Sequence, residues 1–257
     1  MALGWLLAVS VAVVMFVGIT VGLLLDLLVD DVRRGESVAG VDRPMLTFLA
    51  AHREGWLTAA MRTVTTLGSP VGVTLTVAAG VGLLWLRNRR PSYWVIAGLA
   101  LGGAGLIETV TKDVVDRSRP PVGLRVTEVS ADGFSFPSGH ATLAAAAYGV
   151  LAVLVVRQHG HLLTRLAVWT VAVAGSATLG FSRLYLGVHW LTDVLAGWLL
   201  AAAWLTLLFT GLRLLGPAPR GRGSPPARAT ATDPLDSDSD VGGQPLVRGG
   251  HDETVRR

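Results

Sequence analysis

Six apolar runs, each long enough to cross a lipid bilayer, restrict what this chain can fold into. A hydrocarbon core ~30 Å thick requires about 20 mostly apolar residues in a helix. The runs cover residues 3–29, 71–86, 93–111, 141–156, 166–181 and 190–215. We therefore predict an all-α fold, a polytopic membrane protein built as a bundle of six transmembrane helices.

The composition supports a membrane protein and excludes several kinds of site. Only 16% of the 257 residues are charged, whereas soluble domains carry about 25%. The absence of cysteine excludes disulfides, thiolate metal sites and cysteine nucleophiles. The net charge of +4 is modest and forms no basic stripe, so no nucleic-acid partner is expected.

The apolar runs divide the chain into four predicted segments. Residues 1–29 form the first transmembrane helix, which we interpret as a retained span because it lacks a basic start and a small-residue cleavage site. Residues 30–70 form an extracytoplasmic loop, whose apolar residues at near-helical spacing indicate one or two interfacial helices. Residues 71–215 form the catalytic transmembrane core. Residues 216–257, rich in Pro, Gly, Ser, Asp and Arg, form a disordered cytoplasmic tail.

The distribution of arginine predicts the orientation of this multi-pass protein in the plasma membrane. Cytoplasmic loops carry an excess of Lys and Arg. Arginines follow the second, fourth and sixth runs at positions 87, 89, 90, 157, 165, 213, 220 and 222. If the spans alternate, these segments share one side, which makes both termini cytoplasmic. Three polar motifs then lie together on the extracytoplasmic face, where we expect the active site.

The three polar motifs are residues 112–120 (KDVVDRSRP), 137–140 (PSGH) and 182–193 (SRLYLGVHWLTD). Ionisable groups beside membrane spans are costly and mark a functional site by default. Lys112, Arg119 and Arg183 supply three positive charges, two of them as planar guanidinium groups that match phosphate oxygens. In the alternative interpretation, Lys112 reaches to the interface and the arginines are solvated. Glu108, one turn before Lys112, is expected to pair with it in a structural role.

The second motif places Ser138 and Gly139 at the expected start of the fourth span. Backbone N–H groups at a helix start are unpaired, and the helix dipole favours an anion there. Glycine also lets the chain approach a ligand closely. An equally weighted alternative is that Ser138 only caps the helix and that His140 is incidental.

Two histidines are candidates for nucleophilic attack and proton transfer. His189 and Asp193 are four residues apart, and such a pair shares one face of a helix. The carboxylate can then hold one ring nitrogen and leave the other basic and aimed at a substrate, while His140 donates a proton. These three residues could instead bind a metal, but the three neighbouring cations argue against it. His52 is left unassigned, as a candidate contact for a substrate headgroup.

The motifs resemble those of the type-2 phosphatidic acid phosphatase superfamily, which includes bacterial acid phosphatases and vanadium haloperoxidases. The pattern of that superfamily is Lys-x6-Arg-Pro, Pro-Ser-Gly-His and Ser-Arg-x5-His-x3-Asp, and this sequence fills every position in order. The resemblance implies that His189 forms a phosphohistidine, that Asp193 orients it and that His140 protonates the leaving oxygen. It also implies a phosphate site without metal or cofactor, formed by Lys112, Arg119, Ser138, Gly139 and Arg183.

The leading hypothesis is an integral-membrane lipid phosphatase. The candidate substrates are a polyprenyl diphosphate, phosphatidic acid and phosphatidylglycerol phosphate, with a marginal preference for the first. A phosphotransferase that passes the phosphoryl group to a lipid or sugar hydroxyl is the enzymatic alternative. An anion transporter is disfavoured because a pore needs no oriented nucleophile, and a haloperoxidase is disfavoured because this small chain is mostly membrane spans. The oligomeric state is left open.

Overall fold

The computed structural model describes residues 2–34, 37–126 and 133–215, and the predicted tail lies outside these residues. The described residues form eight α-helices, one 3₁₀ helix and no strand. The elements are α1 (Ala2–Arg34), α2 (Ser37–Ala51), α3 (Gly55–Leu67), α4 (Pro70–Asn88), α5 (Ser92–Val115), η1 (Val122–Leu124), α6 (Gly139–Val156), α7 (Leu162–Tyr185) and α8 (Leu191–Leu215). Six of them, α1 and α4 to α8, are long and apolar enough to cross a membrane. The predicted all-α fold with six membrane spans is thus confirmed.

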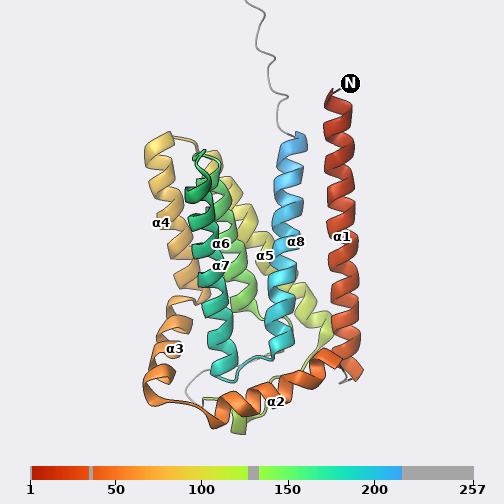
Figure 1. Cartoon of the computed structure of the whole chain (residues 1–257), viewed down its shortest axis with the longest axis vertical. Helices are drawn as coiled ribbons and strands as arrows, with labels where there is room; N and C mark the ends of the chain where they lie inside the picture. The colour runs from red at the N-terminus through yellow and green to blue at the C-terminus, as the bar shows by residue number, and fades with distance from the viewer. Residues whose placement is uncertain (1, 35–36, 127–132, 216–257) are drawn as a thin grey trace, which may run out of the picture. The chain divides into compact units, whose positions relative to one another are not determined.

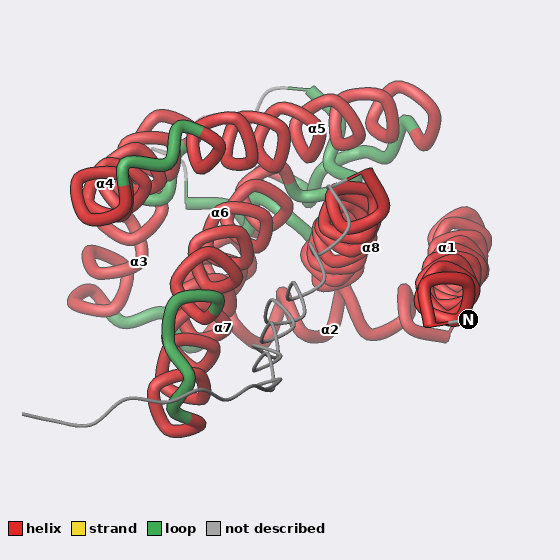
Figure 2. The backbone as a smooth tube through the Cα atoms, turned by 90° about the horizontal axis from the view of Figure 1, so that it is seen from above, coloured by secondary structure: helices red, strands yellow, loops and turns green. Residues whose placement is uncertain are grey.

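Helix α6 is the centre of the bundle and packs against α4, α5, α7 and α8 (Figure 2). Its sequence explains this position, because small alanine side chains let neighbouring helices approach closely. The alanines of α6 with little or no exposed surface are Ala141, Ala144, Ala146, Ala147 and Ala152. The start of α6, which carries the second motif, is therefore enclosed by the other helices.

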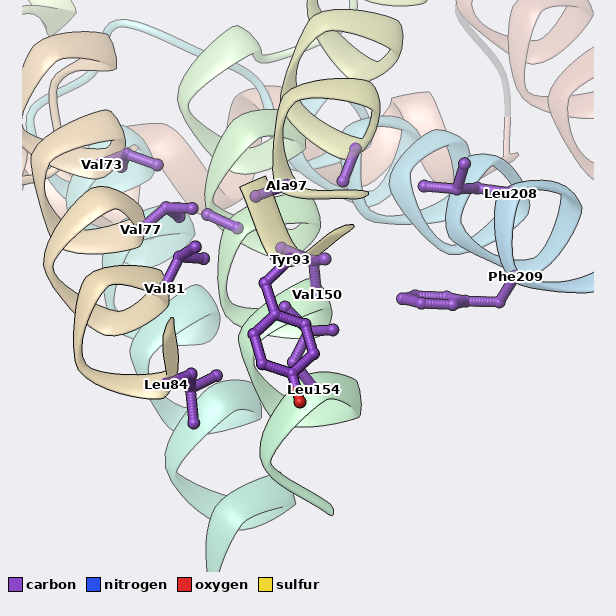
Figure 3. Packing of buried hydrophobic residues seen from close by; sticks show 12 residues of the cluster. Val73, Val77, Val81, Leu84, Tyr93, Ala97, Val150, Leu154, Leu208 and Phe209 are labelled. Atoms are coloured by element: carbon purple, nitrogen blue, oxygen red, sulfur yellow. The ribbon is translucent and has the colours of Figure 1, made fainter. Parts of the chain in front are cut away.

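A cluster of buried hydrophobic residues joins α4 and α5 to α6 and α8 (Figure 3). Helix α4 contributes a stripe at spacings of four and three, formed by Val73, Val77, Val81 and Leu84. Such spacing places all four side chains on one face of the helix. They pack with Val150 and Leu154 of α6, so this cluster fixes the central helix within the membrane-spanning part.

Two shorter helices, α2 and α3, occupy most of the segment between α1 and α4. Helix α2 lies across the lower end of the bundle in Figure 1 and packs against α7 and α8. Its buried residues are Asp42 and Leu46. A buried carboxylate requires a charged or hydrogen-bonding partner, and Asp42 finds such partners beside the polar motifs.

The same end of the bundle carries all three motifs (Figure 1). The first motif begins in the last turn of α5, the second starts α6, and the third connects α7 to α8. The opposite end carries the exposed arginines of the α4–α5 and α6–α7 connections and Arg213 of α8. Alternating helix directions therefore separate two groups of charged residues by the length of the bundle.

Candidate active site

The structure brings the predicted site residues together around His140, in the first turn of α6. The side chains of Lys112, Arg119, Arg183 and His189 all lie within electrostatic reach of its ring. These residues come from α5, the α5–α6 connection, α7 and the α7–α8 connection. Segments that are up to 77 positions apart in the chain, from Lys112 to His189, thus form one basic site.

His189 and Asp193 pair as predicted, but not on one helix. His189 lies in the turn before α8, whereas Asp193 lies in its first turn. The Nδ1 of His189 is 3.3 Å from the Oδ2 of Asp193. The same oxygen accepts a 2.9 Å hydrogen bond from the backbone N–H of Trp190. Asp193 therefore caps the N-terminus of α8, as acidic residues in the first turn of a helix often do. The expectation of a shared helical face was wrong, because the helix begins after His189.

The other ring nitrogen of His189 faces a guanidinium group. Arg119 Nη1 lies 3.1 Å from His189 Nε2, and a guanidinium can only donate. Nε2 must therefore accept, which leaves the proton on Nδ1, next to Asp193. Burial is the main reason that the pKa of His189 falls to about 4, with smaller contributions from the positive charges of Arg183 and Arg119, while Asp193 opposes the shift. The imidazole is consequently neutral at pH 7.

Arg119 and Lys112 lie on the more accessible side of the site. The Nε of Arg119 donates to the carbonyl of Gly133 (2.9 Å), and its Nη1 also donates to that of Val188 (3.0 Å). Lys112 forms the expected ion pair with Glu108. A Cβ on Gly139 would lie 2.7 Å from Oε1 of Glu108, so the start of α6 closely approaches the carboxylate that pairs with Lys112.

Arg183 and Ser138 are buried and keep unused hydrogen-bonding capacity. Arg183 Nη1 donates to Thr65 Oγ1 of α3 over 2.5 Å, but its Nε has no partner among the described residues. Ser138 occupies the N-cap position of α6, yet its side chain makes no capping hydrogen bond. Its Oγ also lacks a partner among the described residues. The helix-cap interpretation of this side chain therefore fails, and the hydroxyl is available to a ligand.

Four residues near the site were missed by the sequence reasoning. Arg117, Asp42 and Thr192 form a buried network with Asp193, and Ser135 Oγ donates to Oδ2 of Asp193 over 2.6 Å. The only available signal was position, since Arg117, Ser135 and Thr192 lie within or beside the motifs.

His52, the unassigned histidine, is engaged within its own segment. Its Nδ1 donates to the carbonyl of Phe48 over 2.8 Å, and its ring lies against the ring of Phe48. None of its described contacts is to a motif residue.

The chain is similar in sequence to proteins of known activity. Phosphatidylglycerophosphatase B of Bacillus subtilis (strain 168) is 36% identical over 164 residues, which cover 63% of this chain and 78% of that protein. The model of the PAP2 superfamily matches residues 93–215, a range that includes all three motifs. The chain belongs to the PAP2 superfamily. Within this superfamily, the chain belongs with the phosphatase hydrolases that act on lipid phosphates, because its relatives are a phosphatidylglycerophosphatase and an undecaprenyl-diphosphatase.

Two further relatives extend the comparison. Undecaprenyl-diphosphatase of Sulfolobus acidocaldarius is 28% identical over 138 residues, which cover 52% of this chain and 61% of that protein. The crystal structure of a transmembrane PAP2-type phosphatidylglycerolphosphate phosphatase from Bacillus subtilis superposes with a TM-score of 0.67 and 26% identity. That match covers 77% of this chain and 96% of the other. The six-span PAP2 fold is therefore shared over most of the described bundle.

The PAP2 chain also contains an apolar cavity of about 620 Å³ between α6, α7 and α8. Its walls include Ala145, Trp198 and Phe209, and none of the residues predicted to bind phosphate lines it. The cavity thus supplies apolar surface in the membrane-spanning part, separate from the charged site.

Proposed function

We propose that this protein hydrolyses a lipid phosphate at the extracytoplasmic face of the plasma membrane, through a phosphohistidine on His189 and without a metal ion. One observation carries the proposal: His189 is held between a carboxylate at Nδ1 and a guanidinium at Nε2. The ring is therefore oriented, neutral and adjacent to a group that binds phosphate oxygens.

In the first step, Lys112, Arg119 and Arg183 bind the phosphoryl oxygens, together with the Ser138 hydroxyl and the Gly139 backbone N–H. Arg119 contacts Nε2 directly, so a phosphoryl group bound to Arg119 has its phosphorus beside the nucleophile. Nε2 attacks phosphorus, the bond from phosphorus to the leaving oxygen breaks, and His140 donates a proton to that oxygen. Asp193 stabilises the positive charge that develops on the ring.

In the second step, water attacks the phosphohistidine. The now neutral His140 accepts a proton from the water. The P–N bond breaks, its electron pair returns to Nε2 of His189, and inorganic phosphate leaves. Fixed cations stabilise the pentavalent transition state in both steps, and electrostatic stabilisation of this kind is often the largest catalytic contribution.

The positive charges around the two histidines argue against a bound metal ion. The charges of Arg119 and Arg183 both act on His189, and Lys112 adds a third cation beside His140. A divalent cation placed among them would be repelled by three unit charges at short range. The same three charges replace the role that a metal has in other phosphatases.

The proposed orientation and substrate rest on different observations. Arginines at the end of the bundle opposite the motifs favour an extracytoplasmic site by the positive-inside rule. Phosphatidylglycerol phosphate is the first substrate to test, because the relative with 36% identity and the matched crystal structure both carry that activity in their names. A polyprenyl diphosphate is the second, by the name of the archaeal relative. The apolar cavity offers space for a hydrocarbon chain of either substrate.

The decisive experiment measures phosphate release by the purified full chain from phosphatidylglycerol phosphate, phosphatidic acid and a polyprenyl diphosphate in detergent. We expect His189→Ala to lose about 10⁴-fold or more of the activity, and a chelator to change nothing. The matched control is His159→Ala, which alters an exposed histidine beyond the far end of α6. Full activity in His189→Ala would falsify the mechanism, and a requirement for added Mg²⁺ would contradict the metal-free site. Loss of phosphate release on addition of an alcohol acceptor, with formation of a new phosphoester, would show a phosphotransferase instead.

A further inference from the structure

We propose that Asp42, on helix α2, is a positioning residue for the nucleophile: through Arg117 it controls how strongly Asp193 supports His189. The inference rests on the proposed function, since it assigns a role around the same histidine. It adds a residue outside the three motifs, contributed by a helix that lies outside the matched range of residues 93–215.

One guanidinium group connects the two carboxylates. Arg117 Nη2 donates to Asp42 Oδ2 over 2.7 Å, and Arg117 Nη1 donates to Asp193 Oδ1 over 2.6 Å. The side chains are 3%, 13% and 0% exposed for Asp42, Arg117 and Asp193 respectively. At this burial, solvent and salt screen the charges only weakly. A change of charge at Asp42 is therefore felt at Asp193.

Thr192 provides a second connection between α2 and the start of α8. Its hydroxyl donates to Asp42 Oδ2 over 2.6 Å, and its backbone N–H donates to Asp42 Oδ1 over 3.1 Å. The same hydroxyl accepts a 2.6 Å hydrogen bond from Arg117 Nη1. Because Thr192 immediately precedes Asp193, Asp42 holds the first turn of α8 as well as the guanidinium group.

Arg117 and Arg119 are two residues apart but have different partners. Arg119 reaches His189 Nε2, where the substrate is proposed to bind. Arg117 uses both terminal nitrogens on carboxylates, and its guanidinium lies 5.3 Å from the ring centre of Trp190. Arg117 thus belongs to the support of the nucleophile rather than to the phosphate site.

Arg117 and Asp42 have opposite charges and therefore opposite effects on Asp193, the hydrogen-bond partner of His189. Asp193 accepts hydrogen bonds from Ser135, Trp190 and His189 at Oδ2 and from Arg117 at Oδ1. A lone guanidinium at Oδ1 would draw the negative charge of Asp193 away from the ring. Asp42 offsets that effect, because it shares the positive charge of Arg117 between two carboxylates. Asp193 is then able to stabilise the positive charge that attack on phosphorus creates on His189.

A purely structural role for Asp42, as an anchor for α2, predicts a different result from a charge role. Loss of an anchor disorders the site whichever partner is removed. Loss of one charge shifts the protonation of His189 in a direction set by its sign. Removal of the negative Asp42 makes the surroundings more positive and lowers the pKa of His189, whereas removal of the positive Arg117 raises it.

The other charged and titratable groups that act on His189 stay constant across these variants. They come from the α5–α6 connection, α6, α7 and α8, and they are Arg119, His140, Arg183 and Asp193. Lys112 of α5 acts on His140 beside it. A difference between variants therefore reports the pair of Asp42 and Arg117.

The test compares Asp42→Asn, Arg117→Gln and Arg117→Lys with the parent chain, and with Asp113→Asn as the control. Asp113 is an exposed acid of α5 at the same end of the bundle, so it matches the loss of one negative charge. ¹⁵N-histidine NMR follows the titration of His189, assigned with His189→Ala, and phosphate release from phosphatidylglycerol phosphate gives kcat and KM.

We expect Asp42→Asn to lower kcat about tenfold, as loss of an outer hydrogen-bond partner of a site residue commonly does, with KM within about twofold. Its His189 midpoint falls below that of the parent. Arg117→Gln raises the midpoint, Arg117→Lys leaves it near the parent value, and Asp113→Asn changes neither quantity. Midpoints that do not move, or that move in the same direction in Asp42→Asn and Arg117→Gln, overturn the inference.

The test remains conclusive if one variant does not fold or if the parent chain releases no phosphate. If Asp42→Asn does not fold, Arg117→Gln carries the test alone, because an unchanged midpoint in that variant contradicts the charge coupling. The NMR titration does not depend on turnover. Absence of phosphate release by the parent chain therefore refutes the proposed function, whereas unchanged titration in an active enzyme refutes only the positioning role.

Discussion

The two ends of the bundle carry the same kind of charged residue in opposite environments. At one end Arg87, Arg89, Arg90, Arg157 and Arg213 are exposed. At the other, Arg183 is 4% exposed and Arg117 is enclosed by two carboxylates. Exposed arginines beside membrane spans need no ligand, since an excess of such residues is typical of cytoplasmic loops in general. Burial is costly unless a guanidinium has partners, so we expect a ligand at Arg183, whose Nε has no partner among the described residues.

The largest difference between the two ends is expected when one arginine is removed from each. We expect Arg183→Ala to lower kcat/KM about 10²- to 10³-fold, because it removes a buried donor aimed at the proposed phosphate site. Arg90→Ala should change it by less than about twofold, since an exposed charge contributes little. Phosphate release from phosphatidylglycerol phosphate measures both, with thermal unfolding in detergent as a check that Arg183→Ala folds. Equal losses in the two variants would show that burial does not separate the functional arginines.

The second prediction concerns the protonation of His189 at the buried end. Its pKa is lowered to about 4, mainly by burial, against about 6.5 for an ordinary imidazole. The difference corresponds to a roughly 300-fold weaker affinity for the proton. ¹⁵N-histidine NMR should show a neutral ring from pH 7 down to near pH 4, and a charged ring only below that. The neutral form, which is the proposed nucleophile, is thus retained in mild acid. A midpoint near pH 6.5 would mean that the site is open to water.

The smallest expected effect separates two serines that both occupy helix N-caps. Ser69 Oγ accepts a hydrogen bond from the backbone N–H of Gly72, whereas Ser138 Oγ has no partner among the described residues. Ser69→Ala should therefore cost about 1 kcal/mol of stability and leave activity nearly unchanged. Ser138→Ala should leave stability unchanged and lower kcat/KM about tenfold, the loss expected for one hydrogen bond to a charged ligand. Thermal unfolding and phosphate release distinguish the two, and a reversed pattern contradicts the ligand role of Ser138.

The sequence predicts well the features that depend on neighbouring residues. The six spans follow from local hydropathy: the structure extends the first five runs at one or both ends, and α8 begins one residue after the sixth run does. The ion pair of Glu108 and Lys112 follows from a spacing of one helical turn. The pairing of His189 with Asp193 was anticipated for a similar reason, although the turn that carries His189 was mistaken for helix.

Other features have no local signal. Arg117 and Arg125 look alike in the sequence, yet Arg117 bridges two carboxylates while Arg125 Nε donates to the carbonyl of Pro120. Asp42 lies 150 positions before Thr192, its hydrogen-bond partner. Gly187 has a φ of +75° and leaves only 2.0 Å between the position of a Cβ and the carbonyl oxygen of Leu124. Contacts of this kind depend on which helices pack together, and that choice is made by the whole bundle.

The all-α membrane fold and the residue types of the candidate site could be predicted from the sequence, because hydropathy and side-chain type are properties of single residues and short runs. The tertiary structure alone decided which charges are buried and what they face. It placed Arg119 beside His189 and Arg117 beside Asp193, and it brought Asp42 of α2 into the network of Arg117. The physical reason is that burial and charge compensation are long-range properties: they exist only once α2, α5, α7 and α8 have packed around the start of α6.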